Sequence, residues 1–305
     1  MPLTAYPGLL AALGAPYLNV SPLLTPGEMY FVNSVRGSNN NDGRDVLRPM
    51  AGWQQAYNKC RANRGDMVVL LPGHAQTITA AAGIALNIAG VTTLALGWGA
   101  NRPTISMTTA TAVSIDVTAA NNIVAGVGGP DSGLIVDATG VDAITAAINV
   151  QAADFAFVNN RMIVADAGGQ AILGLLTTAA ANRMLVAGCV FEGSDDTGTT
   201  TAIRLVGTDR VMLVENKFYG AYGAGVGAIE NLTTDCTNCY VIGNKIDNRT
   251  ATSTKAMVFR TASTGQISGN HMQILSGTAP ITGAAMSWVG ANYYAAVIAT
   301  GGTLI

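Results

Sequence analysis

Charged residues are scarce in this chain of 305 residues, at 11% against roughly 25% in a typical soluble domain. The net charge is −2 and no basic cluster is present, so the charge pattern of a nucleic-acid-binding protein is missing. Hydrophobic residues make up 49% of the sequence. Because exposed apolar surface usually marks an interface, the composition indicates a protein that hides surface in an oligomer or larger assembly.

Long apolar runs are also absent. The most apolar window, residues 80–100, is interrupted by Asn87, Thr92, Thr93 and several glycines, and a spanning helix needs roughly 20 continuous apolar residues. We therefore expect no membrane partner. The amino terminus has no basic start and is rich in proline, which argues against a signal peptide.

Cysteine is too rare to staple a fold of this length. The four cysteines, Cys60, Cys189, Cys236 and Cys239, are interpreted as reduced thiols of a protein made in a cytoplasm. Cys236 and Cys239 form a single CxxC without a second pair or a flanking histidine, so a turn is favoured over a zinc site.

The first 28 residues are predicted to be an extended arm, because prolines interrupt every helical or alternating pattern. We expect this arm to bind partner proteins through its leucines, which are Leu9, Leu10, Leu13, Leu23 and Leu24. The apolar segment 276–305 is predicted to make an oligomer contact.

One helix is predicted in residues 29–66, after a short strand and a polar loop. Trp53, Ala56, Tyr57 and Cys60 recur at i, i+3, i+4 and i+7, which places them on one face of a helix. The helix is expected to begin just after Pro49 and to end near residues 63–65, with its apolar stripe available to cap a core.

A repeat dominates the remainder of the chain. The segments VNNRM, AGCVF, VENKF, IGNKI and SGNHM share a central small residue, and these central residues are Asn160, Cys189, Asn216, Asn244 and Asn270. Successive spacings are 29, 27, 28 and 26 residues. A partial copy, ANNIVAG at 120–126, resembles ANRMLVAG at 181–188, so the array is expected to begin earlier.

This period fits three short strands and three turns, which is one coil of a parallel β-helix. Coils stacked about 4.8 Å apart would place the repeated side chains in a hydrogen-bonded ladder. Residues 67–275 are predicted to form roughly eight such coils. The alternative is an ordinary β-sandwich whose strands share asparagine turns, although a sandwich gives no reason for a constant spacing.

The opening of the chain resembles a known family. A strand, the loop GSNNNDGRD at 37–45, a helix and the strand GDMVVLLPG at 65–73 are similar to the start of right-handed parallel β-helix proteins, most closely the tailspike-like virion proteins of tailed bacteriophages. The resemblance implies an all-β fold, namely a right-handed single-stranded parallel β-helix with an amino-terminal capping helix and an extended amino-terminal arm.

What the resemblance implies about function is a trimeric decoration or cement protein that stabilises a capsid. Its partners would be two further copies of itself and the major capsid protein or other virion proteins, and it would lie on the capsid surface after synthesis in the host cytoplasm. The alternative is a tailspike that binds a host surface glycan and hydrolyses polysaccharide. A cellular carbohydrate-binding module is a third hypothesis.

Polysaccharide cleavage by a glycosidase needs a pair of carboxylates. The candidates are Glu192, Asp195, Asp196 and Glu215, although a polar turn and outward-facing positions are the favoured explanation for them. His74 and His271 are far apart in the sequence and have no evident acidic partner, so neither is predicted to be a catalytic base. We predict no catalytic residue and no cofactor.

Two further motifs are interpreted as structural. RGD at 64–66 is expected to end the helix and begin a strand. The loop at 37–45 offers the oxygens of Asn39, Asn40, Asn41, Asp42 and Asp45, but it lacks the acidic spacing and terminal glutamate of an EF-hand. We interpret it as a set of Asx turns and predict no metal site.

Overall fold

The computed structural model describes residues 27–108, 112–128, 132–166, 169–193, 200–223, 226–249, 255–274, 280–283 and 285–296. The five leucines of the predicted arm and the carboxylates Asp195 and Asp196 lie outside these residues. Within the described part of the chain, no helix has the length and apolar character needed to cross a membrane.

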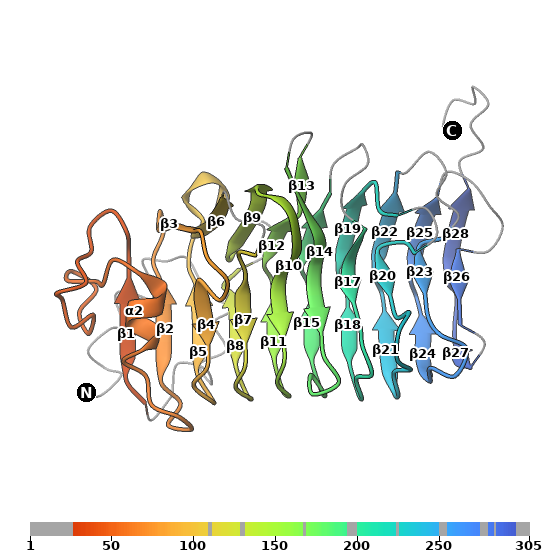
Figure 1. Ribbon diagram of the computed structural model, residues 1–305, viewed down its shortest axis with the longest axis horizontal. Helices are drawn as coiled ribbons and strands as arrows, with labels where there is room; N and C mark the ends of the chain where they lie inside the picture. The colour runs from red at the N-terminus through yellow and green to blue at the C-terminus, as the bar shows by residue number, and fades with distance from the viewer. Residues whose placement is uncertain are drawn as a thin grey trace.

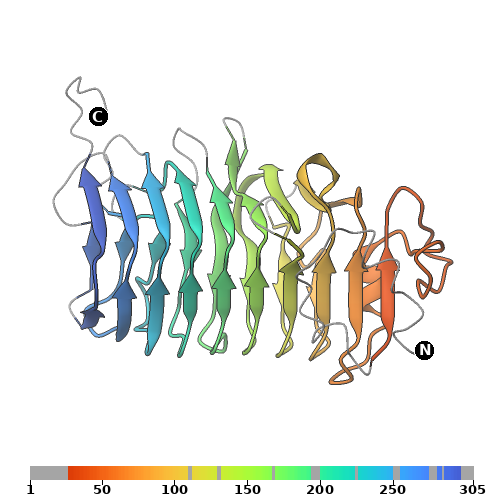
Figure 2. The same cartoon turned by 180° about the vertical axis from the view of Figure 1, so that it is seen from behind.

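The protein is a parallel β-solenoid in which three sheets run side by side along one rod (Figures 1 and 2). Between the two ends of the rod each coil contributes one strand to each sheet, and each strand pairs with its counterpart in the next coil. The described pairs between coils are parallel, which excludes the β-sandwich alternative because a sandwich is built from antiparallel sheets. The short strand β13 (Ala165–Asp166) pairs with β14 (Gly169–Thr177) in an antiparallel hairpin.

Sheet 1 contains β1 (Met29–Val32), β2 (Met67–Leu70), β5 (Thr92–Ala95), β8 (Ile123–Gly126), β11 (Ala156–Val158), β15 (Leu185–Ala187), β18 (Met212–Val214), β21 (Cys239–Ile242), β24 (Gly265–Ser268) and β27 (Met286–Trp288). Sheet 2 contains β3 (Ala75–Ile78), β6 (Thr104–Thr108), β9 (Ile135–Gly140), β12 (Arg161–Ile163), β16 (Val190–Glu192), β19 (Lys217–Gly220), β22 (Lys245–Asn248), β25 (His271–Ile274) and β28 (Tyr293–Ala296).

Sheet 3 contains β4 (Ile84–Leu86), β7 (Ile115–Val117), β10 (Asp142–Val150), β14 (Gly169–Thr177), β17 (Thr201–Arg204), β20 (Ile229–Glu230), β23 (Met257–Val258) and β26 (Ile281–Thr282), with β13 (Ala165–Asp166) beside β14. The partial repeat at 120–126 corresponds to β8, which lies in the same sheet as β15. The coil stack extends from Met29 to Ala296, so it is longer at both ends than the predicted range 67–275.

The core fills the space enclosed by the three sheets. Alternate residues of each strand point inward, and the aligned apolar side chains of successive coils stack on one another. Phe191 and Phe218, for example, are register partners with ring centroids 5.0 Å apart. This periodic stacking is what a constant spacing of apolar residues in the sequence produces.

The helix near the amino terminus is shorter than the sequence predicts. Helix α2 spans Trp53–Tyr57 and packs against β1, β2 and β4. Cys60 is buried but lies beyond the helix, because the chain follows the turn of the coil stack: Asn63 adopts a φ of 57° and its amide donates to the carbonyl of Ala89. A single η helix, η3 (Gly99–Asn101), follows β5 in the described residues.

Candidate functional site

The predicted ladder residues lie on successive coils, immediately before strands of sheet 2, and all five are buried. Asn216, Asn244 and Asn270 form a continuous row in which the side-chain Nδ2 of each donates to the Oδ1 of the next coil at 3.0 Å. The row continues to Asn292, a residue that the repeat search missed because it follows Asn270 by 22 positions.

Each ladder oxygen also accepts a backbone amide from the coil before it. The amide of Asn216 donates to Asn244 Oδ1 at 2.9 Å, and the amide of Cys189 donates to Asn216 Oδ1 at 3.0 Å. Cys189 interrupts the side-chain row, since its thiol donates instead to the carbonyl of Phe157 at 3.3 Å. Burial raises the pKa of Cys189 to about 12, so this thiol stays protonated. The ladder is a structural element of the core.

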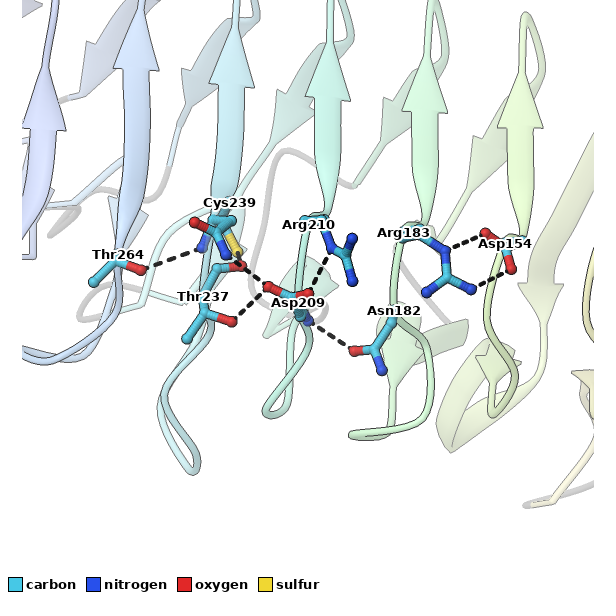
Figure 3. Close-up of polar contacts among 9 residues, drawn as sticks. Asp154, Asn182, Arg183, Asp209, Arg210, Thr237, Cys239 and Thr264 are labelled. Atoms are coloured by element: carbon cyan, nitrogen blue, oxygen red, sulfur yellow. Dashed lines mark hydrogen bonds and ion pairs between the residues drawn. The ribbon is translucent and has the colours of Figure 1, made fainter.

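A second polar row lies on the outside of the rod, at the corner that precedes the sheet 1 strands (Figure 3). Arg183 donates to both carboxylate oxygens of Asp154 on the neighbouring coil, at 2.6 and 2.5 Å. Asp209 accepts from Asn238 at 2.8 Å, from Thr237 at 2.7 Å and from Arg210 at 2.7 Å. These hydrogen bonds lower the pKa of Asp209 to about 2, and the bond from Asn238 has the largest effect.

The carboxylates proposed for catalysis do not form a pair among the described residues. Glu192 ends β16 and forms an ion pair with Arg161 on the preceding coil. Glu215 is exposed in the turn before β19, four positions before Tyr219, which is the register partner of Glu192. Asp195 and Asp196 lie outside the described residues. A buried carboxylate that the sequence reading missed, Glu230, is ion-paired with Arg204.

His74 is fully buried, and its Nδ1 accepts the backbone amide of Ser34 at 3.1 Å. This bond assigns the proton of the neutral imidazole to Nε2. Burial lowers the pKa of His74 to about 4, which makes the histidine part of the packing near the amino-terminal end. His271 is exposed on β25, and its ring stacks on that of Tyr293 at 4.8 Å.

Asp66 of the RGD tripeptide is 1% exposed and accepts two backbone amides, from Glu28 at 2.7 Å and from Arg61 at 2.6 Å. Its carboxylate is therefore occupied in joining the first strand to the segment after α2. A receptor that reads RGD needs the carboxylate at the surface, so the tripeptide has a structural task.

Cys236 and Cys239 are buried and free. The hydrogen bond from Cys239 lowers the pKa of Cys236, and the same contact, together with burial, raises the pKa of Cys239. Cys236 also lies 3.2 Å from the hydroxyl of Thr208. Among the described residues, no group of three or more His, Cys, Asp or Glu side chains is placed to hold a metal ion.

The loop at 37–45 uses its polar side chains on nearby backbone. Asn39 Oδ1 accepts the amide of Gly52 at 3.2 Å, and Asn41 donates to the carbonyl of Pro49 at 2.7 Å. Asp42 and Asp45 each accept an amide two residues later, which is the Asx-turn pattern. Asn40 is exposed at the tip. The loop thereby positions the start of α2.

An open groove of about 440 Å³ crosses the outer face of sheet 2 near the carboxyl-terminal end of the rod. We call it the sheet 2 groove, and its polar and aromatic lining consists of Tyr219, Lys245, Asp247, His271, Gln273 and Tyr293. Lys217 and Lys245 are register neighbours, and neither forms an ion pair with a described residue. Aromatic rings beside unpaired cations suit a saccharide or an anion.

Two columns of side chains face outward on sheet 1. From β1 to β24 the first column contains Met29, Met67, Thr92, Ile123, Ala156, Leu185, Met212, Tyr240 and Gln266. The second contains Phe31, Val69, Leu94, Ala125, Val158, Ala187, Val214, Ile242 and Ser268. Neither column contains a charged residue.

The sequence alone did not predict the sheet 2 groove or the columns of sheet 1, since their residues recur once per coil and become neighbours only when the register is known.

Comparisons with models of protein families, with curated proteins and with solved structures found no match for this chain.

Proposed function

We propose that this chain is a structural protein of a tailed-phage virion, a homotrimer that decorates the capsid surface and stabilises the head. The observation that supports this proposal is that polar side chains link successive coils by hydrogen bonds. The buried asparagine ladder, the carboxylate of Asp66 and the outer row around Asp209 all bond one coil to the next. A cement protein needs such a stiff body, because it must hold its neighbours at fixed positions.

Two finer features belong to the same proposal. Helix α2, with Trp53 and Tyr57 fully buried, closes the amino-terminal end of the core, which an open solenoid end would otherwise expose. The solenoid winds in the right-handed sense, since crossovers between parallel strands are right-handed in about 98% of cases. The capsid contact is made by the arm and its leucines.

Capsids assembled without this protein provide the test. Adding the purified full-length protein should give saturable binding and should raise the temperature at which the capsids rupture. A variant that lacks residues 1–26 should fold and remain trimeric but should not bind. The deletion ends at residue 26 because the amide of Glu28 donates to Asp66 within the solenoid.

The matched control replaces Leu9, Leu10, Leu13, Leu23 and Leu24 with serine and keeps the length of the arm. Loss of binding in both variants assigns the contact to the leucines. Normal capsid binding by the deletion variant would overturn the arm assignment, and failure of the intact protein to bind any capsid would overturn the cement function.

The sheet 2 groove favours a second candidate, a spike that binds a host glycan. Sugar rings pack on aromatic faces, and Tyr219 and Tyr293 lie at opposite ends of the groove, with Lys245 and Asp247 between them on β22. Binding of purified host polysaccharide that is lost in Tyr293→Ala and Lys245→Ala, but kept in Lys255→Ala outside the groove, would favour this candidate.

Hydrolysis of the polysaccharide would distinguish a tailspike from a carbohydrate-binding module. Shortening of the polysaccharide by the wild type, and its loss in Asp195→Ala, Asp196→Ala or Glu215→Ala, would make the protein a depolymerase. Glycan binding without cleavage and without capsid binding would favour the module.

A further inference from the structure

The outer face of sheet 1 is covered at one end of the rod and open along the rest. Near the amino terminus, Phe31, Met67 and Leu94 are 2%, 1% and 5% exposed and belong to a hydrophobic cluster that is separate from the core. Further along the first column, Ile123 and Met212 are 37% and 42% exposed. The same apolar surface therefore continues without a cover.

We infer that this open part of sheet 1 is the surface through which copies of the chain associate. We call it the open sheet 1 face, and it consists of Ile123, Ala125, Ala156, Val158, Leu185, Ala187, Met212, Val214, Tyr240 and Ile242. The inference rests on the proposed trimer and names the side of the solenoid that forms it.

Charge separates this face from the outer face of sheet 2. Sheet 2 presents Lys217 in register with Lys245, and it also carries the ion pair of Arg161 with Glu192. Interface cores are depleted in charged residues and enriched in aromatic residues and methionine. Met212 and Tyr240 lie together on the open sheet 1 face.

The polar row of Figure 3 lies where a rim is expected. Asp154, Arg183 and Arg210 each precede a residue of the first column by two positions, namely Ala156, Leu185 and Met212. Their charges are already paired, Arg183 with Asp154 on the neighbouring coil and Arg210 with the adjacent Asp209. A polar rim beside an apolar core is the usual anatomy of a protein interface, and a rim of internal ion pairs leaves no charge for the partner to neutralise.

A second copy is the occupant that this face fits. Its side chains recur at the strand spacing of about 4.8 Å over five coils, so a partner with the same repeat can pack against every coil. A copy has that repeat and is also free of charge on this face. A threefold axis brings the same face of every copy together, so one apolar face is sufficient for a trimer.

The test compares two substitutions of outward-facing apolar residues, Leu185→Glu on sheet 1 and Ile135→Glu on sheet 2. Ile135 is the register partner of Arg161, so the new carboxylate lies beside a guanidinium. Light scattering after size exclusion should give three times the chain mass of 31.1 kDa for the wild type and for Ile135→Glu. Leu185→Glu should give the 31.1 kDa species with an unchanged circular dichroism spectrum.

The outcomes separate the inference from the function on which it rests. A trimeric, folded Leu185→Glu protein would overturn the choice of face and leave the trimer intact. A monomeric wild type would overturn both.

A second measurement does not require the trimer to dissociate. Met212→Cys should form disulfide-linked dimers within the trimer on mild oxidation, because equivalent residues meet at the axis, whereas Lys217→Cys on sheet 2 should not. The native cysteines are buried and do not compete. Cross-linking of the sheet 2 variant alone would refute the inference.

Discussion

Asn244 offers the most direct test of the buried ladder, because it occupies the middle of the continuous row. Its Oδ1 accepts both the backbone amide and the side-chain amide of Asn216, at 2.9 and 3.0 Å. Its Nδ2 donates to the carbonyl of Leu213 at 2.9 Å and to Asn270 Oδ1 at 3.0 Å. The same Nδ2 also donates to the carbonyl of Ile242 at 3.2 Å, so Asn244→Ala removes five hydrogen bonds from a fully buried site.

The magnitude follows from which partners are left without a bond. The side chain of Asn216 keeps its bond to the carbonyl of Val186, and Asn270 Oδ1 keeps the backbone amide of residue 244. The backbone amide of Asn216 loses the acceptor that the ladder gives it. One buried unsatisfied donor costs about 1–3 kcal/mol and each of the four other lost hydrogen bonds about 1 kcal/mol, so the variant should lose roughly 5–7 kcal/mol.

Hydrogen exchange can locate this loss. In a solenoid each coil contacts only its neighbours, so the effect should remain near the substitution. We expect the amide of Asn216 to exchange roughly 10⁴- to 10⁵-fold faster, since 1.4 kcal/mol is a factor of ten. The amide of Ile148, several coils away on β10, should be unaffected.

The control is Lys245→Ala, which changes the exposed next residue and should leave exchange unaltered. If the Asn216 amide exchanges at the wild-type rate in Asn244→Ala, the ladder does not stabilise the coil stack and the structural argument fails.

Three further predictions concern single sites. The pKa of His74 is about 4 in the folded protein against 6.5 in the unfolded chain. The unfolded state therefore binds the proton first, and the free energy of unfolding should fall by about 3 kcal/mol from pH 6.5 to pH 4. His74→Gln should remove this part of the pH dependence in urea titrations, and an unchanged slope would contradict it. Asp66→Ala should cost about 3 kcal/mol, because two backbone donors lose a buried acceptor. This loss of stability should appear as faster proteolysis near Glu28 in Asp66→Ala, with a smaller effect in Asp66→Asn. Resistance equal to that of the wild type would contradict the prediction. Glu215 has a φ of 54°, so Glu215→Gly should increase the free energy of unfolding by up to about 1 kcal/mol, measured in guanidinium, and Glu215→Ala should not. A gain in stability from alanine would instead point to the charge of Glu215 as the cause.

The fold was readable from the sequence because a solenoid repeats a local rule. A residue that must be small, inward and hydrogen-bonded at one turn must be so at the next, and the spacing of Asn160, Asn216 and Asn244 preserves that constraint. The residue before each ladder position shows the same rule: Asn159 and Glu215 have φ values of 54°, and Gly188 has a φ of 63°. Such a left-handed turn favours glycine and asparagine, which explains the composition of the repeats.

The ends of the stack were harder to predict, because the rule weakens there. Asn292 follows its neighbour by a shorter interval than the other ladder residues, so a search at a fixed period ends too early. The apolar spacing of Trp53, Tyr57 and Cys60 predicts a longer helix than the one that forms. Cys60 is buried although the chain has left the helix by then and joined the turns of the coils. Periodicity reports burial, and it does not distinguish these two backbones.

Low overall charge predicts an interface without locating it, and the register shows where the surface is free of charge. A lysine such as Lys217 and an apolar residue such as Met212 are five positions apart in the sequence and lie on different sides of the rod. Only when each coil is stacked on the next does a charge-free strip appear on sheet 1, with cations and carboxylates on the other sheets and in the row that borders the strip. The charge deficit of the chain is thus a property of one face, which is why substitutions on that face and on sheet 2 should differ in their effect on assembly.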